Sequence, residues 1–314
     1  MRLLTCRTVP GGPPRAAARL GDRVLDLESA SRIDDGPGLP PSLRALLAEG
    51  PAALERARAL CRAAEADPDA FAQALAAESA VEYLPPIPDP DKFLCVGKNY
   101  RAHLEELRRH DLIKEMPQEV TGFVKLTGCL VGHRAKVVKP ADVPRLDYEP
   151  ELVFVIGRRV LGFRKGEDPM SYVAGITVLN DLTDRDMQKR EVASGSRFWT
   201  SKNAPGFGPL GPEIVTLDEI ADPYDLWVTC SVNGEERMRV NTRDQIWKMG
   251  DILAHFSRHI PILPGDLFST GAPGGVAVGK PDAEAFFLQP GDVVTCAIEG
   301  VTALSTTIVG PEDA

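Results

Sequence analysis

Two glutamates stand two residues apart where an apolar run begins, in the segment DYEPELVFVIG at residues 147–157. Side chains at positions i and i+2 of a strand project from the same face, so Glu149 and Glu151 are predicted to lie side by side. Two carboxylates buried in this way repel each other, and a divalent cation between them would convert the repulsion into attraction. Oxygen ligands of this kind suit Mg²⁺, Mn²⁺ or Ca²⁺. The spacing is also compatible with an edge strand whose acids are solvated.

A third acidic side chain ends another apolar run. Residues 173–180 read VAGITVLN, and Asp181 follows them directly. Strand ends are frequent positions for small-molecule and metal sites, so Asp181 is the candidate for a third metal ligand. Asp184 and Asp186 are instead typical of the acidic residues that open a helix.

A histidine and a lysine supply groups that could move protons or balance negative charge. His103 and Glu106 are three residues apart in a predicted helix, where a carboxylate beside the imidazole would orient it as a general base. Lys202 stands alone in a loop rich in glycine and proline, where a partly buried ammonium could stabilise an enolate. The alternatives are an ordinary exposed pair on a helix and a lysine that reaches solvent.

The elements that must position these groups are mostly short strands. From Phe93 onward, apolar runs of strand length are separated by glycine and proline, and they do not alternate regularly with helices. This pattern argues against a doubly wound or barrel α/β fold. We expect a mixed, mainly antiparallel β core with a few covering helices. The helices are expected at residues 100–109, 170–172, 185–190 and 242–258.

The first 84 residues differ in character from the rest. Short strands there are followed by segments rich in Ala, Leu and Arg with helical periodicity, at residues 42–64 and 70–77. Residues 85–92, PPIPDPDK, contain four prolines, which favour an extended and fairly stiff connector. We therefore predict a small N-terminal strand-plus-helix domain at 1–84, a linker at 85–92 and a catalytic domain at 93–314.

Composition narrows the class of protein. The 314 residues are 43% apolar and 26% charged, as in ordinary globular proteins, and the net charge is −9. An acidic surface repels phosphate backbones, so no nucleic-acid partner is expected. No apolar run is long enough to span a bilayer, no secretory segment opens the chain, and the six scattered cysteines suit a reducing compartment. We expect a cytoplasmic protein without a membrane partner or a structural zinc site.

Taken in order, these segments resemble the fumarylacetoacetate hydrolase family. The similarity runs from about Phe93 to Val309 and is greatest to the bacterial and mitochondrial acylpyruvase–oxaloacetate tautomerase branch. It implies a mixed β-roll, or distorted β-sandwich, preceded by a small α+β domain, with a homodimer as the usual state. The matching stretches are CVGKNYRAHLEE, DYEPELVFVIG, AGITVLNDLTDRDMQ, SKNAPGFGPLGP, VNGE and PGDLFSTGAPGGV.

The resemblance also implies a role for each candidate residue. It makes Glu149, Glu151 and Asp181 the ligands of Mg²⁺ or Mn²⁺, and His103 with Glu106 the pair that activates water. Lys202 would be the catalytic lysine. Positions that bind substrate would be Arg185, Gln188, Thr270 and Lys98.

Two residues depart from the family pattern. Ala272 stands where a substrate-binding threonine is common, and Lys98 stands where many members carry arginine. Both departures bear on how the substrate is held rather than on the metal. Residues 111–119 are expected to form a mobile lid that shapes the substrate pocket.

These implications predict a divalent-metal-dependent hydrolase that cleaves a C–C bond in a small 2-oxo or 1,3-dicarbonyl carboxylic acid, such as an acylpyruvate or fumarylpyruvate. The same metal–enolate site supports oxaloacetate tautomerisation or decarboxylation, or isomerisation of a 2-hydroxy-diene-dioate, and these remain alternatives. A catalytically silent binding protein is a third possibility, against which the presence of His103 and Glu106 argues.

Overall fold

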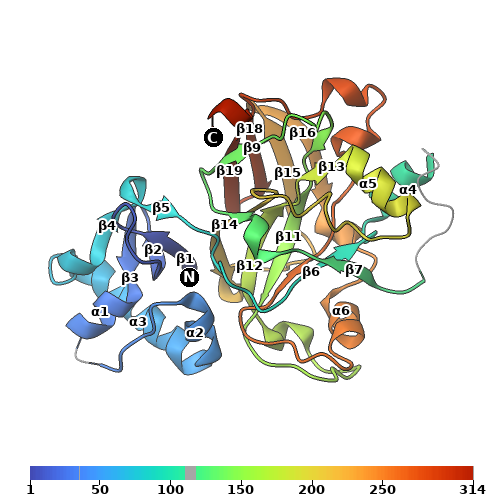
Figure 1. Cartoon of the computed structure of the whole chain (residues 1–314). Helices are drawn as coiled ribbons and strands as arrows, with labels where there is room; N and C mark the ends of the chain where they lie inside the picture. The colour runs from blue at the N-terminus through green and yellow to red at the C-terminus, as the bar shows by residue number, and fades with distance from the viewer. Residues whose placement is uncertain (35, 110–117, 314) are drawn as a thin grey trace.

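A sheet of 12 strands forms the body of the protein in the computed structural model, which describes residues 1–34, 36–109 and 118–313 (Figure 1). Side chains 103, 106, 107 and 109 are outside the description. In spatial order the strands are β4 (Leu75–Ala77), β3 (Arg23–Asp26), β2 (Arg15–Leu20), β1 (Arg2–Arg7), β14 (Gly208–Thr216), β12 (Val173–Asn180), β11 (Pro150–Ile156), β17 (Leu267–Ser269), β6 (Phe93–Gly97) and β7 (Thr121–Val124), with β5 (Glu82–Tyr83) beside β1 and β8 (Leu130–Val131) beside β14.

A second sheet packs against the first. Every residue of β11 is buried, which explains its continuous apolar run. In the second sheet, by contrast, β15 and β18 alternate buried and partly exposed residues, because one face only is covered. Its strands are, in order, β16 (Glu235–Asn241), β15 (Trp227–Val232), β18 (Val293–Ile298), β19 (Thr302–Val309) and β9 (Lys136–Val138); a separate pair is β10 (Leu146–Asp147) with β13 (Thr183–Asp184).

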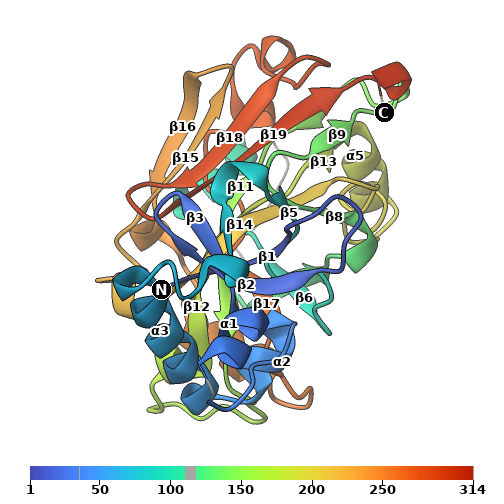
Figure 2. The same ribbon diagram turned by 90° about the vertical axis from the view of Figure 1, so that its left-hand side faces the viewer.

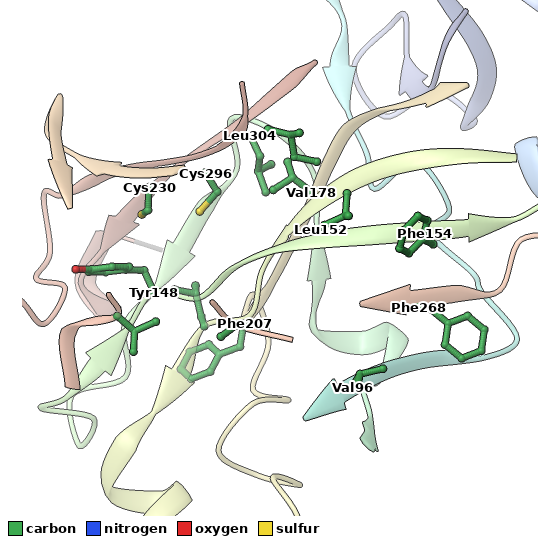
Figure 3. Packing of buried hydrophobic residues seen from close by; sticks show 14 of the residues in the cluster. Val96, Tyr148, Leu152, Phe154, Val178, Phe207, Cys230, Phe268, Cys296 and Leu304 are labelled. Carbon is green, nitrogen blue, oxygen red and sulfur yellow. The ribbon is translucent and has the colours of Figure 1, made fainter. Parts of the chain in front are cut away.

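The main hydrophobic core fills the space between the two sheets. Figure 3 shows Leu152 and Val178 from the large sheet lying toward Cys230, Cys296 and Leu304 from the second one. All six cysteines are buried free thiols, as expected for small apolar core residues. The mixed, mainly antiparallel β fold predicted from the sequence is therefore confirmed.

Helices cover the edges of this structure. Figure 1 shows α4 and α5 together at one side, near β7 and β13. Among the described residues, no helix is long and apolar enough to cross a membrane. The α-helices are α1 (Leu27–Ile33), α2 (Leu43–Ala48), α3 (Pro51–Ala66), α4 (Arg101–Arg109), α5 (Arg185–Ala193) and α6 (Met249–Phe256), and the 3₁₀ turns are η1 (Ala72–Ala74), η2 (Glu78–Ala80), η3 (Thr127–Cys129), η4 (Pro169–Tyr172), η5 (Leu217–Glu219), η6 (Thr242–Asp244), η7 (Ala277–Gly279), η8 (Ala283–Ala285) and η9 (Pro311–Asp313).

Two predicted helices are shorter than expected. The helix predicted at 242–258 extends only from Met249 to Phe256. Residues 242–244 form the 3₁₀ turn η6, and the side chain of Asn99 then binds the backbone N–H and C=O of Trp247 just before α6 begins. The segment 70–77 is mostly not helical, since Leu75 pairs with Leu25 as part of β4. In both places a contact distant in the sequence accompanies the departure from local helix propensity.

The N-terminal lobe continues the large sheet. β1 pairs with β14 through Arg2 opposite Val215 and Leu3 opposite Ile214, and Figure 2 shows the lobe's strands and helices in front of the body. Arg2 and Arg19 strengthen this junction, since both guanidinium groups bind the buried carboxylate of Glu213 at 2.6 Å. The domain limits at 84 and 93 stay a prediction.

Candidate metal centre

The ends of two central strands bring three carboxylates together. β11 and β12 are antiparallel, with Glu151 opposite Leu179, so the beginning of β11 lies beside the end of β12. The backbone N–H of Asp181 donates to the carbonyl of Glu149 at 2.8 Å, which holds the two segments in register. This pairing places the side chains of Glu149, Glu151 and Asp181 in one cluster, as predicted.

The three carboxylates converge and are buried. One oxygen from each lies within 4.8 Å of the others, and the exposed fractions of Glu149, Glu151 and Asp181 are 4%, 2% and 0%. The alternative of solvated acids on an edge strand is therefore wrong. Burial and the neighbouring charges of Asp181 and Glu149 raise the pKa of Glu151 well above its usual value.

Lys202 lies directly against two of these carboxylates. Its Nζ is 2.5 Å from Oε2 of Glu149, 2.6 Å from Oδ2 of Asp181 and 2.8 Å from Oγ1 of Thr183. Only 3% of Lys202 is exposed, so it does not reach solvent. Burial alone would lower its pKa, but the two carboxylates outweigh this and raise the pKa above the usual value.

A second buried lysine was missed by the sequence analysis. Lys125 follows β7, and its Nζ is 2.6 Å from Oδ1 of Asp181 and 2.6 Å from the backbone oxygen of Lys202. It is only 1% exposed. The one signal in the sequence is a single charged residue between the apolar neighbours Val124 and Leu126, which is too common to identify a site.

Arg185 joins the cluster from the first position of α5. Asp184 caps this helix by accepting the N–H groups of Asp186 and Met187, in agreement with the prediction for these acids. The Arg185 guanidinium then reaches Asp147 at 2.7 Å and Glu149 at 2.7 Å.

Asp147 and Gln188 fix the orientation of that guanidinium. Gln188 accepts from Nη1 of Arg185 at 2.9 Å. Asp147, which is fully buried, also accepts the backbone N–H groups of Ala277 and Val278, at 2.9 and 3.0 Å. Asp147 therefore links Arg185 to the backbone at Ala277 and Val278.

Seven charged side chains are buried together here, and we call them the inner cluster. Their formal charges nearly balance. Four carboxylates against three cationic groups leave a formal charge of −1. Its members are Asp147, Glu149, Glu151, Asp181, Lys125, Arg185 and Lys202.

The donor set fits a divalent cation. Glu151 accepts a hydrogen bond from Ser269 but makes no ion pair with any side chain that the structure describes. A buried carboxylate without a cation is costly unless it is protonated or binds a metal. The oxygens of Glu149 and Asp181 next to it complete an all-oxygen ligand set, which suits Mg²⁺ or Mn²⁺.

A cavity of about 380 Å³ opens onto the three carboxylates. Arg185, Gln188 and Lys98, which the family resemblance gives a role in substrate binding, line it, and so do Lys202 and Ala272. Its apolar walls are Val96, Phe123, Val192, Phe198, Val278 and Phe287.

Other predicted site residues lie elsewhere or are not described. Thr270 does not line the cavity; its hydroxyl lies 3.2 Å from that of Tyr100 and donates to the backbone oxygen of Leu152. His103 and Glu106 fall on α4, as predicted, but their side chains lie outside the described residues, as do residues 111–117 of the expected lid.

The sequence of this chain is similar to a known protein family over most of its length. A family model described as fumarylacetoacetate (FAA) hydrolase C-terminal matches residues 92–309. The mitochondrial oxaloacetate tautomerase of Xenopus laevis is 33% identical over 312 residues, which cover 98% of this chain and 90% of that protein.

Two solved structures share the whole architecture. The 5-carboxymethyl-2-hydroxymuconate delta-isomerase of Mycobacterium smegmatis is 25% identical with a TM-score of 0.70, and the alignment covers 99% of each chain. The maleylpyruvate hydrolase of Sphingobium sp. SYK-6, solved with manganese (II) and pyruvate, is 26% identical with a TM-score of 0.73, again over 99% of each chain. Three different reactions are thus named among the proteins similar to this chain.

Proposed function

The chain belongs to the fumarylacetoacetate hydrolase family, and we propose that it catalyses the metal-dependent keto–enol tautomerisation of a small 2-oxo acid, with oxaloacetate as the first candidate. One observation carries the proposal: three buried carboxylates converge at the base of a cavity, and the carboxylate of Glu151 makes no ion pair with any described side chain. The Xenopus relative, similar over nearly its whole length, supports the choice of reaction.

The inner cluster suits enolate chemistry. When bound, a divalent cation would polarise the 2-oxo carbonyl group. Lys202 adds a fixed positive charge beside the ligand carboxylates, where a developing enolate oxygen can be stabilised without reorganisation of solvent. Arg185, held by Asp147 and Gln188, presents its guanidinium to the same cavity and would orient the substrate carboxylate.

Proton transfer is assigned to the helix beside the cavity. We propose that His103, oriented by Glu106, takes the proton from C3 of the keto form, and that the enolate oxygen then takes a proton from water to give the enol. In ketonisation the enol loses its O–H proton to water, and the protonated His103 returns a proton to C3. This role rests on the match of the CVGKNYRAHLEE segment to the family and on the position of both residues on α4.

Hydrolysis of a C–C bond, predicted from the sequence, is the second candidate. It uses the same enolate-stabilising groups, with His103 taking the proton from water instead of from carbon. The similarity to maleylpyruvate hydrolase over 99% of both chains favours it. An acylpyruvate or fumarylpyruvate would be the substrate.

A single set of assays distinguishes these reactions. The protein is incubated with enol-oxaloacetate, acetylpyruvate and fumarylpyruvate, with Mg²⁺, with Mn²⁺, and with a chelator. We expect metal-dependent acceleration of oxaloacetate ketonisation and no cleavage products. Release of pyruvate from the acylpyruvates would favour the hydrolase, and no turnover of any substrate by metal-loaded protein would contradict both.

Two further expectations belong to the same proposal. We propose a homodimer, which is supported by the family resemblance and by exposed apolar side chains such as Val192 and Trp199. Light scattering of the purified protein tests it, and a monomeric mass would contradict it. The cytoplasmic location stays a prediction, since the Xenopus relative is named as mitochondrial.

A further inference from the structure

One more buried carboxylate lies on α5 and has no part in the proposed reaction. Glu191 stands in the last turn of this helix, which supplies Gln188 and Val192 to the cavity lining, and it is only 8% exposed. It forms no ion pair with any side chain that the structure describes. A carboxylate without a cationic partner is costly to bury unless hydrogen-bond donors compensate it. The donors therefore show what Glu191 holds in place.

Two consecutive residues directly before Lys202 supply these donors. Oε1 of Glu191 accepts the backbone N–H of Thr200 at 2.5 Å. Oε2 accepts the hydroxyl group of Ser201 at 2.6 Å and its backbone N–H at 3.4 Å. Ser201 is fully buried, so water does not compete for its bonds. Since hydrogen bonds to a charged acceptor are about twice as strong as neutral ones, Glu191 ties α5 firmly to the backbone that carries Lys202.

The carbonyl groups of the same segment are held from the other side. The backbone oxygen of Ser201 accepts the N–H of Asp184 at 2.9 Å, and that of Lys202 accepts Nζ of Lys125 at 2.6 Å. Glu191 holds the N–H groups, whereas these two contacts hold the carbonyl groups. The backbone is thus fixed on both sides at the point where Lys202 extends its ammonium group to two of the candidate metal ligands.

Glu191 also closes the segment that follows α5. Its backbone oxygen accepts the N–H of Ser196 at 2.9 Å, and its carboxylate binds the residue directly after residues 194–199. The segment therefore begins and ends at one residue. Arg197 and Phe198 from this segment line the cavity, so Glu191 lies at the base of part of the cavity wall.

We propose that Glu191 is a positioning residue, which fixes the backbone before Lys202 and so keeps the Lys202 ammonium beside the candidate metal ligands. The inference rests on the proposed function for the role of Lys202 in stabilising the enolate. An ammonium displaced by about 1 Å stabilises the developing charge less, whereas the binding of the substrate carboxylate, assigned to Arg185, is retained. Loss of the Glu191 contacts should therefore lower kcat more than it changes KM.

Glu191→Gln tests the positioning role with little change in volume. The variant places an amide N–H₂ group or a neutral oxygen where the charged oxygens accept their bonds. In steady-state kinetics with oxaloacetate and Mn²⁺, kcat should fall by about tenfold to 100-fold, while KM stays within a factor of about three. Ser201→Ala should also lower kcat, but by a smaller factor in Glu191→Gln than in the wild type, because both changes remove the same contact.

Amide hydrogen exchange tests the same contacts without turnover. The backbone N–H groups of Thr200 and Ser201 should exchange about tenfold or more faster in Glu191→Gln than in the wild type, as for the loss of one hydrogen bond to a charged group. Mass spectrometry of the peptide that contains both residues measures the rates.

Asp266→Asn is the matched control. Asp266 is also a buried carboxylate that accepts two backbone N–H groups, those of Lys92 and Leu263, and it lies outside the cavity lining. The control should lower the stability of the protein but leave kcat and the exchange of residues 200 and 201 unchanged. A general loss of stability and a loss of positioning are thereby separated.

The outcomes also separate this inference from the proposed function. Unchanged exchange at Thr200 and Ser201 in folded Glu191→Gln would overturn the inference, and so would an unchanged kcat in an active protein. If Glu191→Gln does not fold, Ser201→Ala carries the same test, and unchanged kcat and exchange in that variant would overturn the inference. Faster exchange in a protein that tautomerises no 2-oxo acid would leave the hold of Glu191 on the segment standing and overturn the proposed reaction.

Discussion

Lys125 and Asp181 form a completely buried ion pair, with Nζ 2.6 Å from Oδ1 and both side chains inaccessible to solvent. Because the other oxygen of Asp181 binds Lys202, this carboxylate is shared between two lysines. Lys125 also binds the backbone oxygen of Lys202 and so fixes the loop that carries it. Lys125 is therefore a positioning residue for the candidate metal ligand Asp181 and for Lys202.

Replacement of Lys125 tests this relationship. Lys125→Met leaves a buried carboxylate with one partner fewer, so the free energy of unfolding should fall by about 3–5 kcal/mol in metal-free protein. Added Mg²⁺ should restore part of the loss, because it supplies positive charge to the same carboxylates. Chemical denaturation measures both values. Lys136→Met, at an exposed position on β9, is the control, and equal stability of the two variants would contradict the positioning role.

Arg185 should contribute mainly to substrate binding. Its guanidinium contacts Asp147, Glu149 and Gln188 at once, which the single ammonium of a lysine cannot do. Arg185→Lys should raise KM by roughly tenfold or more, the value of one lost charge-assisted hydrogen bond, with a smaller change in kcat. Steady-state kinetics with the active substrate measure this, and Arg190→Lys on the same helix is the control. A fall in kcat at unchanged KM would contradict the assignment.

His103 should be required for turnover and dispensable for the metal. His103→Ala removes the proposed base, so kcat should fall by about 10²–10⁴-fold. The affinity for Mn²⁺ should stay within a factor of about two, since no ligand is lost. Turnover assays and calorimetry on one preparation check both statements. His255→Ala, on α6, is the matched control, and a fully active His103→Ala variant would contradict the general-base role.

A histidine far from the candidate metal centre should determine part of the pH dependence of stability. Nδ1 of His133 accepts the backbone N–H of Ser305 at 3.0 Å, and burial, with a further effect of Arg134, lowers its pKa to about 4. The unfolded chain therefore binds the proton more readily, and the stabilisation present above an ordinary pKa of 6.5 is lost as the pH falls toward 4. The free energy of unfolding of His133→Gln should depend less on pH over this range, and parallel profiles would contradict the account.

The carboxylate cluster could be predicted from the sequence because local rules determine most of it. The period of a strand puts Glu149 and Glu151 on one side, and the end of an apolar run marks Asp181. Family resemblance added Arg185 and Gln188, which the structure places on the wall of the same cavity.

The remaining features depend on contacts between distant parts of the chain. Lys125 and Arg197 reach the site because β7 and the segment after α5 are brought there by the sheet, and neither carries a local motif. Thr270 faces Tyr100 and Leu152 instead of the cavity. The late start of α6 likewise coincides with the contact between Asn99 and Trp247, which no local pattern reveals.

The central claim is that Glu149, Glu151 and Asp181 bind one divalent cation. Its most direct test is calorimetric titration of metal-free protein with Mn²⁺, for the wild type, Glu151→Gln, and Asp186→Asn as a control on the cavity wall outside the cluster. The account predicts one ion per chain for the wild type and the control, and a loss of affinity of about 100-fold or more for Glu151→Gln with the fold intact. Unchanged Mn²⁺ affinity in a folded Glu151→Gln protein would contradict it.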